Sequence, residues 1–303
     1  MSIIEKAANR LHKSPAAEAE MQEPEVPPTK EDRPSIIEAA RSRADGSDVP
    51  QGEVPQGEVA RSQRTVTIQA KRLTNAGMIS PDGERSKISE EFRLIKRPLI
   101  ANAFGQGSQQ VNNGNLIMVT SSFPGEGKSF CAINLALSIA MELDRTVLLV
   151  DADVAKPSLP RFLGFEAEKG LLDLLLDDKL TVADVMLKTN IPKLTILPAG
   201  RTHKYATELL SSEAMNNLIN ELSTRYPDRL IIFDSPPLLA TSEASVLATH
   251  MGQIVLVVEA EKTPREKINE ALSLLESCEV IGLLLNKGGH TSSGEYYYGN
   301  YGS

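Results

Sequence analysis

Residues 116–130 read LIMVTSSFPGEGKSF. The stretch opens with a continuous apolar run that is typical of a buried strand, and a helical pattern follows from about residue 128 to residue 143. Between them lies the glycine-rich loop 121–129, with the sequence SSFPGEGKS. A strand, such a loop and then a helix form the context of a phosphate-binding loop. The sequence therefore predicts that this loop holds the phosphates of a nucleotide.

Each residue type in the loop has a physical role in holding phosphate. Gly125 and Gly127 let the backbone turn its N–H groups inward, and the helix N-terminus adds partial positive charge. Lys128 supplies a positive charge to the β- and γ-phosphates, and the Ser129 hydroxyl can ligate Mg²⁺. The strict motif begins with Gly or Ala, whereas this chain has Ser122 there. The candidate nucleotide-binding residues are Pro124, Gly125, Glu126, Gly127, Lys128, Ser129 and Phe130, with Asn286 as a candidate for adenine contact.

Further apolar runs predict a sheet around this loop. They cover residues 147–153, 194–200, 230–237, 253–260 and 280–287. Helical stretches separate most of them, for example 207–226 and 263–278, and Ser89 is expected to begin an earlier helix. Continuous apolar strands that alternate with helices indicate an α/β fold, a mostly parallel sheet with helices on both faces.

Three aspartates stand at the ends of predicted strands. Asp151 and Asp153 end VLLVDAD, and Asp234 ends LIIFD. Ligands of such sheets bind beyond the carboxyl ends of the strands, and alternation along a strand places Asp151 and Asp153 on one side. We expect Asp153, Asp234 and Ser129 to hold Mg²⁺, and we expect Lys128 and all three aspartates to be catalytic, with the identity of the proton-accepting Asp left open.

The segments at both ends of the chain do not follow this pattern of alternating strands and helices. Residues 1–13 predict a short amphipathic helix, and residues 14–85, rich in Pro, Glu, Ser and Gln with the repeat VPQGE-VPQGE, predict a mostly disordered linker. The phosphate-loop domain is expected over 86–290. Residues 291–303 form a flexible tail that holds four of the six tyrosines: Tyr296, Tyr297, Tyr298 and Tyr301.

Composition excludes several classes of function. The net charge is −8, which argues against general nucleic-acid binding. The two cysteines have no CxxC spacing and are expected to be reduced, and no apolar stretch approaches the length of a membrane span. Any membrane contact is therefore expected to come through a partner or a surface.

The segments SSFPGEGKS, VLLVDADVAKP and IIFDSPP together resemble the Walker A, Walker A′ and Walker B motifs of bacterial tyrosine kinases. This family is built on the P-loop ATPase fold shared with MinD and ParA, and the resemblance covers roughly residues 86–303. The segments EEFRLIKRPL and VAKPSLPRFLG, with the tail, are most similar to tyrosine autokinases that accompany exosortase and exopolysaccharide gene clusters. Where much of the family has Arg after the second Walker A′ aspartate, this chain has Ala155 followed by Lys156.

The resemblance implies an ATP- and Mg²⁺-dependent protein-tyrosine autokinase that regulates exopolysaccharide synthesis or export. The tail tyrosines Tyr296, Tyr297, Tyr298 and Tyr301 would be phosphorylated in trans within a ring-like homo-oligomer. The family's E-x-x-R-x-x-R helix for self-association corresponds to Glu90, Arg93 and Lys96, where lysine replaces the last arginine. The resemblance also implies a membrane activator of the chain-length-regulator type, a tyrosine phosphatase as partner, and a cytoplasmic location at the inner membrane.

Two other functions share these motifs. A MinD- or ParA-like ATPase switch has the same fold but carries a signature lysine early in the loop, where this chain has Phe123. A scaffold that binds nucleotide without kinase activity is the second alternative. The absent lysine and the tyrosine tail favour the kinase over the switch, and the intact Lys128, Ser129 and aspartates favour it over the scaffold.

Overall fold

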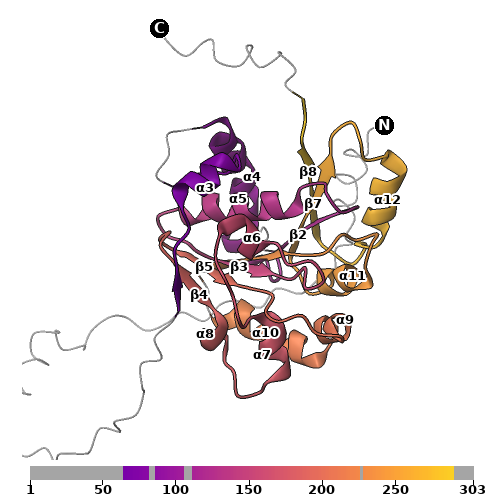
Figure 1. The fold of residues 1–303 in the computed structure, drawn as a ribbon. Coiled ribbons are helices and arrows are strands. Elements are labelled where there is room, and N and C mark those ends of the chain that lie inside the picture. Colours follow the sequence, from indigo (N-terminus) through magenta and orange to yellow (C-terminus); the bar gives the residue numbers. More distant parts are fainter. Residues whose placement is uncertain (1–63, 82–85, 106–110, 226–227, 290–303) are drawn as a thin grey trace, which may run out of the picture. The chain divides into compact units, whose positions relative to one another are not determined.

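A computed structural model describes residues 64–81, 86–105, 111–225 and 228–289. The predicted helix at 1–13, most of the predicted linker and the tyrosine tail at 291–303 lie outside these residues. Within the described part, the chain forms one sheet with helices on both faces, which confirms the predicted fold class (Figure 1).

The sheet has eight strands in the described residues, in the order β1-β4-β5-β3-β6-β2-β7-β8. All neighbouring pairs are parallel except β4 with β5, which is antiparallel. The carboxyl ends of β5, β3, β6, β2, β7 and β8 therefore lie along one edge. The bounds are β1 (Thr65–Val66), β2 (Leu116–Ser121), β3 (Thr146–Asp151), β4 (Leu187–Thr189), β5 (Leu194–Leu197), β6 (Arg229–Asp234), β7 (Gln253–Glu259) and β8 (Val280–Asn286).

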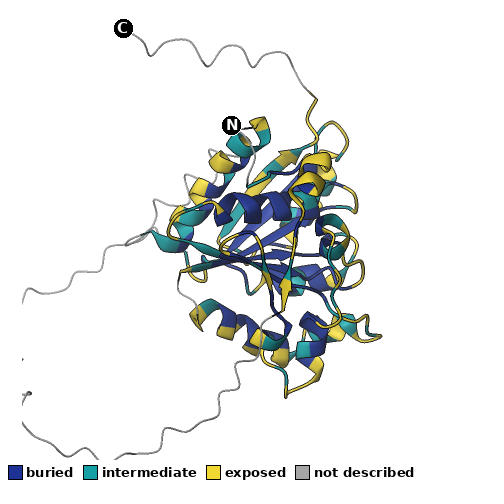
Figure 2. Ribbon diagram, turned by 60° about the vertical axis from the view of Figure 1, so that its left-hand side comes forward, coloured by how far each residue is buried: buried dark blue, intermediate teal, exposed yellow. Residues whose placement is uncertain are grey.

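Helices cover both faces of the sheet, and the central strands are buried between them (Figure 2). Leu116 and Met118 of β2 point into one core, whereas Ile117 points into the other, as the alternation of strand side chains requires. One core includes residues of α3 (Ala70–Asn75), α4 (Lys87–Phe104), α5 (Lys128–Ala140) and α6 (Leu159–Leu163). The other includes residues of α7 (Leu171–Leu176), α8 (Val182–Val185), α9 (Ala206–Leu210), α10 (Glu213–Arg225), α11 (Ser242–Ala248) and α12 (Arg265–Ser273).

Helix α5 holds the phosphate loop at its start and is buried on nearly all sides. It packs between the sheet and α4, which explains why its sequence KSFCAINLALSIA has almost no polar face. Helix α4 begins earlier than predicted, because Ser86 is its N-cap. The Ser86 Oγ accepts from the Ser89 N–H while the Ser89 Oγ accepts from the Ser86 N–H, so Ser89 completes the cap from inside the helix.

The ordered domain begins well before the predicted boundary at residue 86. Residues 64–81 were expected to belong to the linker, but β1 pairs with β4, and Leu73 of α3 is fully buried. The Ile79 N–H also donates to the Asn134 Oδ1 in the interior. Residues 64–81 fold with the domain because they carry buried apolar residues: Ile68, Leu73, Met78 and Ile79. The polar composition that predicted disorder ends upstream of them.

Candidate active site

The phosphate loop joins β2 to α5 at the carboxyl edge of the sheet. Gly125 and Gly127 have φ angles of 91° and 101°, in the left-handed region that favours glycine. A Cβ on Gly127 would lie 2.1 Å from the Asn286 Nδ2, so a larger residue would displace that side chain and would also be strained by the positive φ. Gly127 is the N-cap of α5 and Lys128 its first residue, which places the lysine at the positive end of the helix. The loop therefore has the geometry that anions require.

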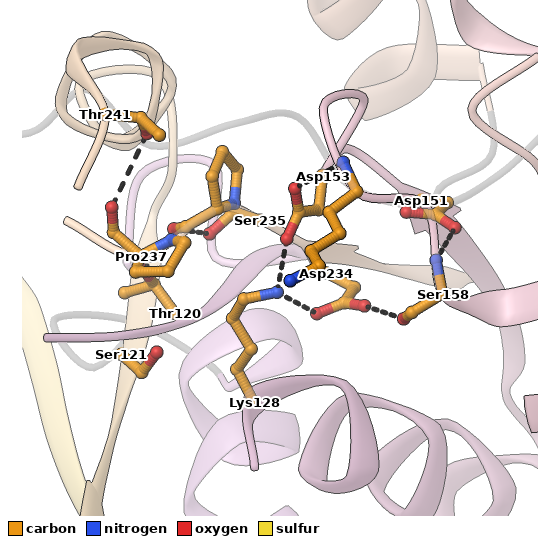
Figure 3. A network of polar contacts seen from close by, with 12 residues as sticks. Thr120, Ser121, Lys128, Asp151, Asp153, Ser158, Asp234, Ser235, Pro237 and Thr241 are labelled. Atoms are coloured by element: carbon orange, nitrogen blue, oxygen red, sulfur yellow. Dashed lines mark hydrogen bonds and ion pairs between the residues drawn. The ribbon is translucent and has the colours of Figure 1, made fainter. Parts of the chain in front are cut away.

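Lys128 lies among carboxylates. Its Nζ is 2.6 Å from the Asp153 Oδ2 and 3.8 Å from the Asp234 Oδ1 (Figure 3). The lysine is 8% exposed, and Asp153 is 5% exposed. The structure thus brings together Lys128 and two of the three predicted aspartates in a largely dehydrated setting, where their charges interact strongly.

Asp151 lies next to this group, and its carboxylate bonds to the chain that follows β3 rather than to Lys128. Its Oδ2 accepts from the Ser158 N–H at 3.0 Å and from the Leu159 N–H at 3.1 Å, and in Figure 3 Asp151 lies to the right of Asp153. Strand β3 ends at Asp151, so strict alternation does not extend to Asp153, and the two carboxylates bond to different partners. Burial, and then the neighbouring Asp234, raises the pKa of Asp151 to about 8.

Asp234 is fully buried at the end of β6. Its Oδ2 accepts from the Ser158 Oγ at 3.2 Å, and the Ser129 hydroxyl is near enough to act on the pKa of the carboxyl group. Burial raises the pKa of Asp234, whereas the Lys128 charge and these hydroxyl groups act in the opposite direction. Ser158 is a site residue that the sequence reasoning missed, although it lies in the segment VAKPSLPRFLG that carried part of the resemblance.

The donor set fits Mg²⁺ held together with phosphates. Asp153 and Asp234 share one lysine, and Oδ1 of Asp151 and of Asp234 are buried without a hydrogen-bond partner among the described residues. No group of three or more acidic, His or Cys ligands is preassembled in this part of the chain. Mg²⁺ commonly takes one or two carboxylates, waters and substrate phosphates rather than an all-protein cage.

Other predicted nucleotide-binding residues have structural contacts of their own. Glu126 is buried; its Oε2 accepts from the Phe123 N–H at 2.8 Å, and its Oε1 accepts from the Thr263 hydroxyl. The Asn286 Nδ2 donates to the Glu126 backbone oxygen at 2.8 Å. These contacts hold the loop against the segment after β7 and the end of β8. Pro124 is exposed at the loop, and the side chain of Phe130 packs against the core beside α4.

The three residues proposed for self-association do not share one surface. Glu90 and Arg93 form an ion pair of 2.7 Å on the outside of α4. Lys96 instead points inward and is 5% exposed, with its Nζ 2.5 Å from the Ser138 carbonyl oxygen and 2.7 Å from the Glu142 Oε1. The exposed basic residue at this point of the helix is Arg97. Tyr296, Tyr297, Tyr298 and Tyr301 lie outside the described residues.

Comparison with known proteins places these features in a family. A model of the AAA domain family matches residues 114–281. Tyrosine-protein kinase YwqD of Bacillus subtilis is 34% identical over 218 residues, which cover 71% of this chain and 88% of YwqD. The kinase domain of the Escherichia coli tyrosine kinase ETK superposes with a TM-score of 0.63 at 25% identity, covering 80% of this chain and 89% of that domain.

Some relatives are much longer. The succinoglycan biosynthesis transport protein ExoP of Rhizobium meliloti is 32% identical over 235 residues, which are 76% of this chain but 28% of ExoP. Among the described residues, no helix has the length and apolar character needed to cross a membrane.

Proposed function

The chain belongs to the bacterial tyrosine-protein kinase family, and from this premise we propose that its phosphate loop transfers the γ-phosphoryl group of ATP to Tyr296, Tyr297, Tyr298 and Tyr301 of a neighbouring copy. The observation that carries the proposal is the position of Lys128, at the N-terminus of α5 and against Asp153 and Asp234. This is the arrangement of a group that neutralises phosphate charge during phosphoryl transfer.

The Lys128 Nζ lies 2.6 Å from the Asp153 Oδ2. We expect the lysine to exchange this contact for the β- and γ-phosphates, while the backbone N–H groups of the loop bind their oxygens. Mg²⁺, held by Ser129, Asp153 and Asp234 with waters and phosphates, would neutralise charge on the transferred group. The side chains that would supply the electrostatics are thus gathered at the phosphate loop.

We assign the proton-accepting role to Asp151. Its Oδ2 is fixed by two backbone N–H groups and its Oδ1 lacks a hydrogen-bond partner among the described residues. A pKa of about 8 suits a group that takes a proton near neutral pH. As the tyrosine oxygen forms its bond to γ-phosphorus, the bond from γ-phosphorus to the ADP oxygen breaks and the phenol proton passes to Asp151.

We further propose that the chain works beside a membrane. It would bind a separate membrane activator and assemble into a ring-like homo-oligomer. A tyrosine phosphatase would remove the phosphate groups from its tail. The name of ExoP supports a role in exopolysaccharide synthesis or export. Glu90, Arg93 and the exposed Arg97, rather than the buried Lys96, are the residues of α4 that would face a neighbouring subunit.

A mixing experiment tests the kinase activity and also whether one chain phosphorylates the tail of another. One full-length variant carries Phe at the four tail tyrosines, and the other carries Lys128→Met with an intact tail. After incubation with ATP and Mg²⁺, mass spectrometry should find phosphate on Tyr296–Tyr301 of the Lys128→Met chains only when both variants are present. A tail that stays unmodified, even with the cytoplasmic segment of the activator added, would refute the proposal.

A further inference from the structure

The loop between β5 and α9, residues 198–205, carries an arginine whose position is set by a buried carboxylate. Asp173 is 5% exposed, and its Oδ1 accepts from the Arg201 Nε at 2.7 Å. Its Oδ2 accepts from the backbone N–H of Arg201 at 3.1 Å and of Gly170 at 3.0 Å. One carboxylate therefore fixes both the main chain and the side chain of Arg201.

The backbone here tolerates no substitute for glycine. Gly200 has a φ of 86°, and a Cβ on it would lie 2.4 Å from the Asp173 Oδ2. A Cβ on Gly170 would lie 2.1 Å from the Pro198 carbonyl oxygen. Two glycines, one of them strained for any other residue, hold the β5–α9 loop against the start of α7, so that a buried acid meets Arg201.

The outer end of Arg201 is free to bind. Its side chain is 75% exposed although Asp173 holds the Nε, and neither Nη atom has a hydrogen-bond partner among the described residues. Lys204, on the same loop, is exposed as well. A guanidinium held in this way presents two parallel N–H donors, the geometry that binds phosphate in bidentate fashion.

The loop lies at the carboxyl edge of the sheet, on the side of β3 rather than of β7 and β8. Along the carboxyl edge, β5 and β3 lie on one side of β2, and β7 and β8 with Asn286 lie on the other. The Thr207 Oγ1 of α9 donates to the Glu243 Oε1 of α11 at 2.5 Å, and α9 lies beside α11 in Figure 1. The segment that leads into α11 in turn bonds to the phosphate loop, through the Leu239 N–H and the Ser122 carbonyl oxygen. The loop thus borders the catalytic edge on the side of Asp153.

The chain as a whole carries a net charge of −8, so a phosphorylated tail meets overall repulsion from it. Each tyrosine phosphate adds close to two negative charges at neutral pH, so continued phosphorylation of one tail becomes harder unless a local cation binds the product. Arg201 is such a cation.

We propose that Arg201 binds a phosphotyrosine on the acceptor tail of a neighbouring copy, so that a tail already phosphorylated once is retained while another tyrosine reacts. This inference rests on the proposed kinase function. The four tyrosines lie within six residues, so an extended tail spaces them by roughly 3 to 17 Å, which allows one to be bound while another reaches γ-phosphorus.

Peptide binding tests the proposal without requiring turnover. The probes are fluorescent peptides of residues 290–303, either unmodified or phosphorylated at one of the four tyrosines. They are titrated by anisotropy into the full-length chain with Phe at its four tail tyrosines. At least one monophosphorylated peptide should bind about tenfold tighter than the unmodified one, and Arg201→Ala should abolish that difference without weakening the unmodified peptide.

Matched variants make the result specific to Arg201. Arg201→Lys should restore only part of the preference, because lysine lacks the planar fork. Arg265→Ala should leave it unchanged, since Arg265 is an exposed arginine on the other side of β2. Equal binding of all peptides, or a preference that persists in Arg201→Ala, would overturn the proposal. The peptide titration involves no catalysis, so it tests only the binding role of Arg201. Failure of the kinase proposal would appear in the mixing experiment instead.

Discussion

Replacing Lys128 with methionine should destabilise the protein as well as inactivate it. The change removes the cation that lies 2.6 Å from Asp153 and 3.8 Å from Asp234, in a group whose side chains are at most 10% exposed. Loss of one partner from a buried ion pair typically costs about 3–5 kcal/mol of unfolding free energy. For a domain of this size that corresponds to a fall in Tm of roughly 6–20 °C.

The effect should depend on pH. Burial already raises the pKa of Asp234 in the folded protein, and without the Lys128 charge, which opposes that effect, this pKa rises further above the unfolded value. The variant therefore loses stability as the pH rises from about 4, and its deficit should be largest near pH 8 and smallest near pH 5. Protonation at low pH relieves the repulsion that the lysine relieves in the wild type.

Thermal unfolding in the absence of nucleotide, followed by circular dichroism at pH 5 and pH 8, measures this deficit. Lys262→Met is the matched control, because that side chain is 73% exposed and its ion pair with Glu259 should contribute under about 1 kcal/mol. Adding Asp153→Asn to Lys128→Met should recover part of the loss at pH 8. The reasoning is wrong if Lys128→Met and Lys262→Met unfold together at both pH values.

Three further outcomes follow from single contacts. With Asp151 as the base, kcat/KM should rise about tenfold per pH unit below about 8 and then level off; a flat profile from pH 6 to 9 would contradict that role. Gly127→Ala should weaken ATP binding by about 10- to 100-fold in calorimetry, because the new Cβ would clash with Asn286 and φ is 101°, whereas Gly289→Ala meets open space and should bind normally. Lys96→Met should cost about 1–3 kcal/mol in chemical denaturation, whereas the exposed Arg97→Met should change stability by less than about 0.5 kcal/mol; equal losses would show that burial of Lys96 is not what matters.

Local sequence was enough to predict the phosphate loop. The apolar run of β2, the glycines of the loop and the start of α5 are adjacent in the chain, so their geometry depends on short-range sterics and hydrogen bonding. Strand ends are local features as well, and for this reason Asp153 and Asp234 could be expected near Lys128.

Composition predicted burial less well in segments that contain both polar and apolar residues and pack against the core. Residues 64–81 follow a polar stretch, yet Leu73 and Ile79 are buried because β4 and α5 offer surfaces that the sequence does not reveal. Lys96 shows the same limit: its inward direction depends on the Ser138 carbonyl oxygen, 42 residues away.

The sequence by itself determined the class of site, because the chemistry of a phosphate loop is encoded in one short stretch. Only the tertiary structure decided how the charges are arranged: which aspartate meets Lys128, which one bonds to the Ser158 and Leu159 backbone, and that Asp173 fixes Arg201. The physical reason is that the strength of a charge interaction depends on distance and burial, and here both are set by residues far apart in the chain.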